Sequence, residues 1–165
     1  MSRMSNVALA VTAVVLLALG SVSAAIGPPA LEIPAGFRHW YFVNSMIITK
    51  DSPRFRSIDG LHHIYVNDIG LPRLMKGGST PYPDGTLFVD DVRDVSLVDG
   101  AFLQGSRKAI PVMLKDSKKY AATGGWGYAQ FDKDGKPGPE SDLKKCFPCH
   151  QAIKDRDFVF TRYTP

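Results

Sequence analysis

Apolar and β-branched residues occur in short runs along the chain, and most of these runs have the length of one strand. Turn-forming Gly, Pro and Asp residues separate the runs, as is typical of an antiparallel sheet. The first run, 37–49, is almost unbroken, which predicts a strand buried on both faces or a strand entering a turn. Further strands are predicted at 61–66, 86–92, 109–114 and 124–131, with a sixth candidate at 157–163.

The segment 68–78 has the signals of a short helix rather than of a strand. Asp68 is a possible N-terminal cap, Pro72 limits the length, and a double glycine at 77–78 provides a stop. Pro111 lies inside a strand run and predicts an edge or a bulge, because proline cannot donate to a ladder. The predicted fold is therefore α+β, mainly β: an antiparallel sheet of about five strands with a few short helices.

The first 25 residues have the pattern of an export signal. Arg3 precedes an apolar run at 7–19, and small residues at 21–25 provide a cleavage site. A membrane anchor fits less well, because the run is shorter than the roughly 20 apolar residues that cross a bilayer. We expect residues 1–25 to be a signal peptide, the mature protein to lie in the periplasm, and residues 26–165 to form a single domain.

Charge and cysteine content argue against a nucleic-acid-binding protein and against a disulfide-rich fold. The formal net charge is +4, and removal of the signal takes away Arg3 and no acid, which leaves +3 with both signs mixed along the chain. This balance does not predict a nucleic-acid partner. The two cysteines lie within four residues of each other, so no framework of distant disulfides is expected and their role must be local.

That role is indicated by the sequence CFPCH at 146–150, the C-x-x-C-H pattern of covalent haem attachment. Two thiols with this spacing can each add to one haem vinyl group, while the adjacent imidazole reaches the iron as an axial ligand. We therefore predict one covalently bound haem c at the C-terminal end of the chain. Cys146 and Cys149 form its thioether bonds, and His150 is the ligand of its iron.

Three other interpretations of the motif are weaker. A thioredoxin-like dithiol lies early in a βαβ unit, whereas only fifteen residues follow His150. A structural zinc site needs a fourth ligand besides the two cysteines and the histidine. A short-range disulfide is compatible with the periplasm but gives the neighbouring histidine no role.

Seven segments together resemble the cytochrome P-460 family, which also includes the cytochromes c′-beta. In chain order they are FRHWYFVNSM, LHHIYVND, YPDGTLFVDD, RKAIPVMLKDS, ATGGWGYAQF, CFPCH and DFVFTRY. The resemblance spans most of the predicted mature chain. It implies an antiparallel sheet with a few helices, usually in a homodimer, and it agrees with the strand count obtained from the apolar pattern alone.

The resemblance also implies an activity. Enzymes of this family oxidise hydroxylamine, and convert its nitrosyl intermediate toward nitrous oxide, at a haem that is further bonded to a lysine side chain. Lys76, between the predicted helix and the YPDG turn, is the candidate for that crosslink. A lysine in the last turn of a helix is also favoured by the helix dipole, so this residue has an ordinary structural explanation as well.

The proton acceptor that this chemistry requires is less evident. The position that aligns with a glutamate in active relatives is Gln104, and glutamine cannot act as a general base. Asp90, Asp91 or Asp99 could replace it if the sheet directs one of them toward the iron. His62 and His63 face opposite ways on a strand, and we expect both to be structural rather than iron ligands.

Three functions remain open from the sequence. The first is hydroxylamine oxidation at a five-coordinate, lysine-modified haem, with a small periplasmic cytochrome as electron acceptor. The second is nitric oxide binding at an unmodified haem, and the third is simple electron transfer. The enzyme is favoured over the electron carrier, because no convincing sixth ligand for the iron is found.

Overall fold

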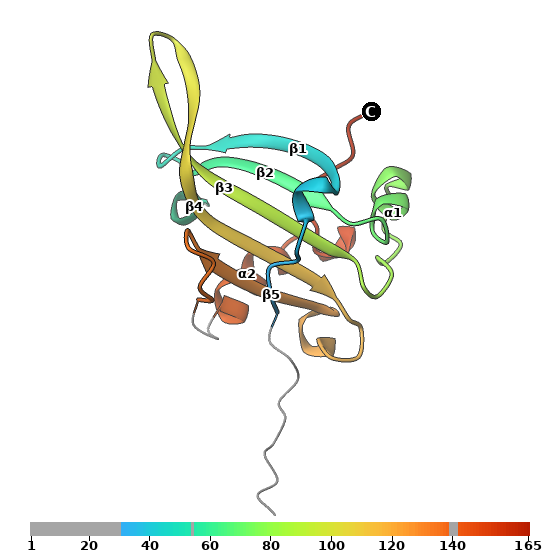
Figure 1. The fold of residues 1–165 in the computed structure, drawn as a ribbon. Coiled ribbons are helices and arrows are strands. Elements are labelled where there is room, and N and C mark those ends of the chain that lie inside the picture. The colour runs from blue at the N-terminus through green and yellow to red at the C-terminus, as the bar shows by residue number, and fades with distance from the viewer. Residues whose placement is uncertain (1–30, 54, 139–141) are drawn as a thin grey trace, which may run out of the picture.

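The structure is a computed structural model that describes residues 31–53, 55–138 and 142–165 of the chain. One antiparallel sheet of five strands dominates it, in the order β1-β2-β3-β4-β5 (Figure 1). The predicted mainly β fold is confirmed, whereas the predicted signal peptide lies outside the described residues. The strands are β1 Tyr41–Ile48, β2 Gly60–Val66, β3 Leu87–Val98, β4 Ala101–Lys115 and β5 Trp126–Asp132.

The helices are few and short. Helix α1 spans Leu71–Lys76 and α2 spans Asp142–Gln151. Within the described residues, no helix has the length and apolar character needed to cross a membrane. In the described part of the chain, four single-turn 3₁₀ helices complete the elements: η1 Phe37–His39, η2 Arg56–Ile58, η3 Ala121–Thr123 and η4 Lys154–Arg156.

Helix α1 confirms the helix predicted at 68–78 but begins later than expected. Gly70 is its N-cap, and the turn before it is held by Asn67, whose Oδ1 accepts the Gly70 N–H, rather than by Asp68. Pro72 lies in the first turn, where its missing N–H costs nothing. The helix ends as predicted, because Gly77 adopts a φ of 67° that residues with a side chain avoid.

Three strand predictions are wrong in detail, one of which is the sixth candidate, because the segment 157–163 forms no strand. The run 37–49 is not one buried strand: η1 occupies its start, and β1 is an edge strand on which Phe42 and Ile47 are exposed. Pro111 is at neither an edge nor a bulge, because β4 pairs with β3 on one side and β5 on the other. One missing N–H removes a single ladder bond, which the many other pairs of this long strand offset.

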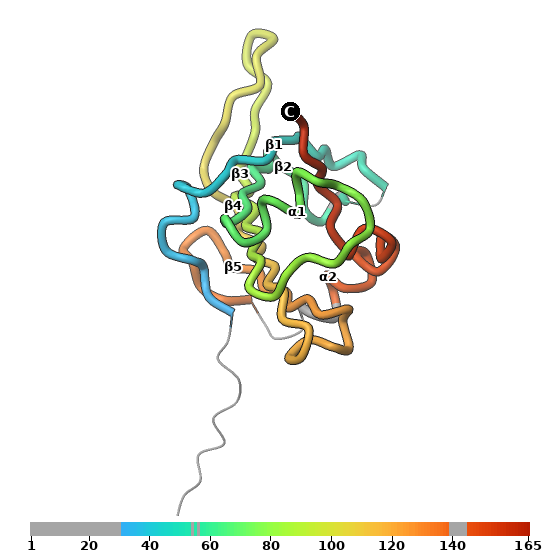
Figure 2. The backbone as a smooth tube through the Cα atoms, turned by 90° about the vertical axis from the view of Figure 1, so that its right-hand side faces the viewer, coloured from blue at the N-terminus to red at the C-terminus, as the bar shows by residue number. Residues whose placement is uncertain are grey.

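The two faces of the sheet carry separate apolar cores, because side chains alternate along each strand. The face covered by α2, called the α2 face below, carries Val66, Phe88, Trp126 and Tyr128. The opposite face, which η1 covers, carries Val89, Ile110, Val112 and Phe131 packed on Phe37. Figure 2 shows α1, α2 and the C-terminal segment on the same side of the sheet.

The backbone at the start of β5 is closely approached by an aromatic ring. A Cβ atom on Gly127 would lie 2.3 Å from Cζ of Tyr120, so the ring of Tyr120 occupies the space that any larger side chain would need. The glycine between Trp126 and Tyr128 is therefore required by packing. It allows both large aromatic residues to remain on the α2 face.

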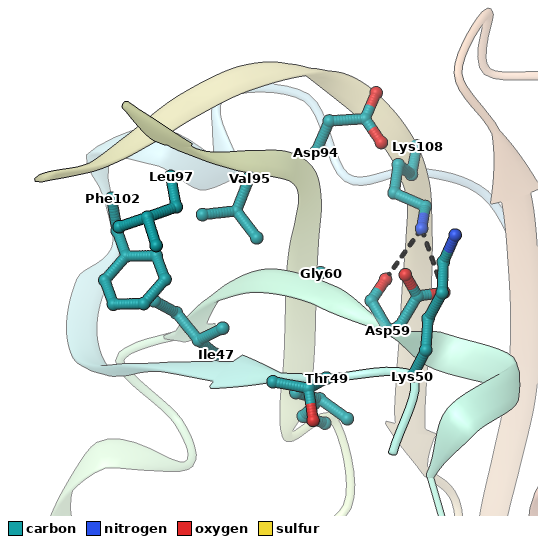
Figure 3. A pocket seen from close by; sticks show the side chains of 11 residues that line it. Ile47, Thr49, Lys50, Asp59, Gly60, Asp94, Val95, Leu97, Phe102 and Lys108 are labelled. Atoms are coloured by element: carbon teal, nitrogen blue, oxygen red, sulfur yellow. Dashed lines mark hydrogen bonds and ion pairs between the residues drawn. The ribbon is translucent and has the colours of Figure 1, made fainter. Parts of the chain in front are cut away.

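Strands β3 and β4 are longer than the other strands, and the hairpin that they form projects beyond the sheet (Figure 1). Asp99 and Gly100 form its two-residue turn, both with positive φ, the geometry favoured in tight hairpins. A hollow of about 370 Å³ lies between the base of this hairpin and the end of β1 (Figure 3). Lys108 forms an ion pair across its rim with Asp59, with Nζ and Oδ1 3.1 Å apart.

Candidate functional site

The motif residues Cys146, Cys149 and His150 all lie on α2. Their spacing of three and four residues places the three side chains on one side of the helix. Cys146 is half-buried against the core of the α2 face, whereas Cys149 is exposed, and both are present as thiols. The helix therefore presents two reactive sulfur atoms and an imidazole beside one another.

The imidazole of His150 is fixed in one tautomer. Its Nδ1 lies 2.7 Å from the backbone oxygen of Phe158, and because a carbonyl only accepts, Nδ1 must carry the hydrogen. This leaves the Nε2 lone pair available for a metal, the arrangement that orients most histidine ligands. Burial lowers the pKa of His150, although the bond to Phe158 opposes the shift, so the imidazole is neutral at pH 7.

Two aromatic rings hold the same imidazole from its sides. The ring centroid of Tyr128 is 4.9 Å away and that of Phe160 is 5.0 Å away. Tyr128 comes from β5 and Phe160 from the C-terminal segment, so the ligand is clamped between the sheet and the end of the chain. Burial, followed by the nearby Cys146, raises the pKa of Tyr128, which keeps its hydroxyl protonated.

Several buried polar atoms around this site have no hydrogen-bond partner within the described part of the chain. A buried polar group without a partner is costly, so a cluster of them indicates a space built for another group. Tyr128 lies against the histidine, and Trp126 belongs to the same core. Asn44 and Asp90 both pair with Ile64, which packs against that core, so they lie on the same face. These residues fit a flat cofactor with polar edges. The atoms are Asn44 Oδ1, Asp90 Oδ1, Trp126 Nε1, Tyr128 OH and Thr161 Oγ1.

A cavity of about 600 Å³ adjoins the α2 face between α1 and the C-terminal segment. This volume is in the range of small-molecule and cofactor sites. Leu74 and Tyr82 line one side of it and Val159 and Tyr163 the other.

The two catalytic candidates from the sequence occupy different places. Lys76 is exposed at the end of α1, and its neighbours Met75 and Gly77 line the cavity just described. Gln104 lies on the exposed part of β4, with Oε1 2.8 Å from Nε2 of His63. His63 packs on Phe42, away from the α2 face, so Gln104 lies apart from His150, whereas the neighbours of Lys76 line the cavity that adjoins the α2 face.

The three aspartates considered as proton acceptors in place of Gln104 also lie on different parts of the fold. Asp99 is exposed in the hairpin turn, and Asp91 points away from α2. Asp90 lies on the α2 face, bonded to the buried His62. The predicted opposite orientation of His62 and His63 is confirmed. Alternation along β3 could have assigned Asp90 to this face if the face of one neighbour had been known.

The aromatic residues of the site were only partly accessible from the sequence. Trp126 and Tyr128 could be found because they alternate with small residues, and both lie on the α2 face. The contact of Phe160 with His150 and the hydrogen bond that His150 donates to the Phe158 carbonyl were missed. No local pattern marks either one, since both depend on how the last residues of the chain fold back onto α2.

The family model for cytochrome P460 matches residues 34–161, which is most of the chain. The chain belongs to the cytochrome P-460 family. No curated protein matches the sequence closely enough to be compared. Family membership makes this protein a haem-binding homologue of the cytochromes P-460, and the free Nε2 of His150 is compatible with binding an iron.

Proposed function

We propose that this cytochrome P-460 homologue is an exported c-type cytochrome that oxidises hydroxylamine at a single haem. Cys146 and Cys149 would hold the haem through thioether bonds, and His150 would bind its iron through Nε2. The observation that carries the proposal is the hydrogen bond from His150 Nδ1 to the Phe158 carbonyl. It prepares an imidazole for iron next to two thiols on the same helix.

When bound, the haem would supply an open coordination position for hydroxylamine and a route for its electrons. The residues of the chain would bind the haem, orient its histidine ligand and shield the site from water. Tyr128 and Phe160 prevent the imidazole from rotating, and the Phe158 carbonyl keeps Nδ1 protonated. Phe88 and Val66 make the neighbouring sheet surface apolar, which excludes water and strengthens electrostatic interactions there.

Lys76 tests the enzymatic branch of the proposal. In the wild-type protein we expect a strongly red-shifted Soret band, the sign of a lysine-modified haem. Lys76→Met is expected to restore an ordinary c-type spectrum and to lower hydroxylamine oxidation roughly 10- to 100-fold, by analogy with the loss of groups that tune a metal site. Absorption spectra of both redox states and steady-state oxidation assays measure the two effects.

The control for this experiment is Lys118→Met, which removes an exposed lysine beyond the far end of β4 and should change neither result. An ordinary c-type spectrum in the wild-type protein would contradict the crosslink. It would favour the second candidate, a nitric oxide binding cytochrome with an unmodified haem. That alternative draws support from the apolar α2 face, since gas binding needs little more than an open apolar pocket.

The proposed location and electron acceptor follow from the same chemistry. Residues 1–25 lie outside the described part of the chain, and their sequence pattern supports export to the periplasm. A small periplasmic cytochrome is the proposed acceptor of the electrons. Fractionation of cells that produce the full chain measures the location directly.

We also propose a homodimer that uses the exposed apolar surface of the β3–β4 hairpin. Leu97 and Phe102 are each 63% exposed, and they pair with each other across the hairpin. Surface of this kind on a projecting arm favours contact with another protein, here a second copy of the chain. Ile47 on β1 extends the surface beside them (Figure 3).

Replacement of both Leu97 and Phe102 by aspartate is expected to convert the dimer to a monomer. Two charges in an apolar interface cost several kcal/mol, enough to shift the dissociation constant by roughly 100-fold or more. Light scattering after size-exclusion chromatography measures the mass, with Lys118→Asp as the control. A wild-type protein that remains monomeric at millimolar concentration would contradict the proposed dimer.

A further inference from the structure

A buried acid–base pair lies on the α2 face apart from the cysteine motif. Asp90 on β3 pairs in register with Ile64 on β2 and lies two residues from Phe88. Ile64 and Phe88 both belong to the core that contacts Cys146. Because side chains two apart on a strand share a face, Asp90 projects toward the side on which the haem would lie.

The two oxygens of Asp90 are in different situations. Oδ2 lies 2.7 Å from Nδ1 of His62, a side chain that is only 2% exposed. Oδ1 is buried and has no hydrogen-bond partner among the described residues. One oxygen is therefore held in place by the histidine, while the other presents free lone pairs to the α2 face.

His62 is itself held from the other side. Its Nε2 lies 2.7 Å from the backbone oxygen of Ile58, so Nε2 must donate its hydrogen there. One further proton is shared between Nδ1 of His62 and Oδ2 of Asp90. The pair thus exists either as imidazolium and carboxylate or as imidazole and carboxylic acid, and in both forms the Oδ2 contact is kept.

The environment of the pair favours proton uptake. Burial raises the pKa of Asp90 and outweighs the hydrogen bond from His62, with Asp91 adding to the rise and His63 opposing it. Burial lowers the pKa of His62, but the hydrogen bond and charge of Asp90 raise it overall against the charge of Lys108. Both groups therefore hold a proton more readily than in water.

The neighbouring residue shows the opposite arrangement. Asp91 accepts hydrogen bonds from Arg38, Arg93 and Arg107. Burial acts to raise the pKa of Asp91, but these guanidinium groups outweigh it and lower the pKa overall. The Asp91 carboxylate therefore stays ionised, and both of its oxygens are hydrogen-bonded. The two adjacent aspartates therefore differ in their ability to accept a proton. Of the two, Asp90 has a buried oxygen without a hydrogen-bond partner and lies on the α2 face.

We propose that Asp90, positioned by His62, is the proton acceptor of this cytochrome, with hydroxylamine or another small protonated nitrogen ligand as the donor. In the step, Asp90 begins as a carboxylate beside the His62 imidazolium. An N–H or O–H bond of the bound ligand breaks, the proton forms a bond to Oδ1, and the electron pair stays on the ligand. The electrons then leave to a one-electron acceptor such as a ferric cytochrome. This inference rests on the proposed function, and it assigns the base that Gln104 cannot supply.

Cyanide and nitric oxide provide a test that does not depend on turnover. Hydrogen cyanide must lose its proton when it binds ferric haem, whereas nitric oxide binds ferrous haem without proton transfer. In the Asp90→Asn holoprotein we expect cyanide to bind about 100-fold more slowly at pH 7, the scale of one general base. The nitric oxide association rate is expected to stay within about threefold, which shows that the pocket is intact. Asp94→Asn, at an exposed aspartate of the same strand, is the matched control and should bind cyanide at the wild-type rate.

His62→Gln tests the positioning role separately. It leaves the Asp90 carboxylate in place but removes the imidazole, so the pH at which cyanide binding reaches half its maximal rate should rise. If Asp90→Asn fails to incorporate haem, this pH profile still tests the pair. Cyanide rates unchanged in Asp90→Asn, or an unchanged pH profile in His62→Gln, would overturn the proposal. A wild-type protein that binds cyanide as expected but does not oxidise hydroxylamine would instead refute the proposed function alone.

Discussion

Serine at both Cys146 and Cys149 is expected to remove covalent haem from this protein completely. Both cysteine sulfur atoms of the chain lie on α2, and serine cannot form the thioether bonds that attach a haem c. Haem would then be released when the protein is unfolded. Haem staining of a denaturing gel and intact-protein mass spectrometry measure the result, with the wild-type protein retaining one haem per chain.

His150→Ala is the matched control for this experiment. It leaves both thiols and is expected to keep haem attached while the spectrum changes, because only the iron ligand is lost. Haem that stays bound to the unfolded double serine variant would refute the assignment of the cysteines. Two haems per wild-type chain would refute the proposal of a single site.

Asp157→Asn is expected to destabilise the protein by about 3–5 kcal/mol, the range for removal of one partner from a buried ion pair. The Asp157 carboxylate lies 2.7 and 2.9 Å from Nζ of Lys115, and both side chains are less than 10% exposed. It also accepts the backbone N–H of Tyr82 at 2.7 Å. Asparagine keeps the shape and tolerates the positive φ of 49° at this position, so the loss of charge is isolated.

The same substitution should weaken the haem site. Asp157 directly precedes Phe158, whose carbonyl holds His150, and it ties the C-terminal segment to β4. Urea unfolding monitored by circular dichroism measures the loss of stability, and Asp155→Asn, two residues away and exposed, should change it by less than about 0.5 kcal/mol. A loss below about 1 kcal/mol for Asp157→Asn would contradict a structural role for the buried pair.

Local patterns predicted the elements of the fold well. Alternating and continuous apolar runs identified five strands, and the double glycine correctly ended α1 at Lys76. These signals depend on residues within one or two turns of each other, so no knowledge of distant contacts was needed. The errors at 37–49 and Pro111 arose where burial or pairing depended on which strands lie alongside.

The CFPCH motif and the alternation of apolar residues follow from the order of amino acids alone, because the spacing of two thiols and an imidazole is a property of five consecutive residues. The choice between Asp90 and Asp91 required the fold, since strand alternation separates their faces and pairing decides which face meets α2. Contacts between distant residues, such as Lys115 with Asp157, also required it. Folding brings together groups that are 42 positions apart, and their burial sets the charges and the free lone pairs on which the proposed chemistry depends.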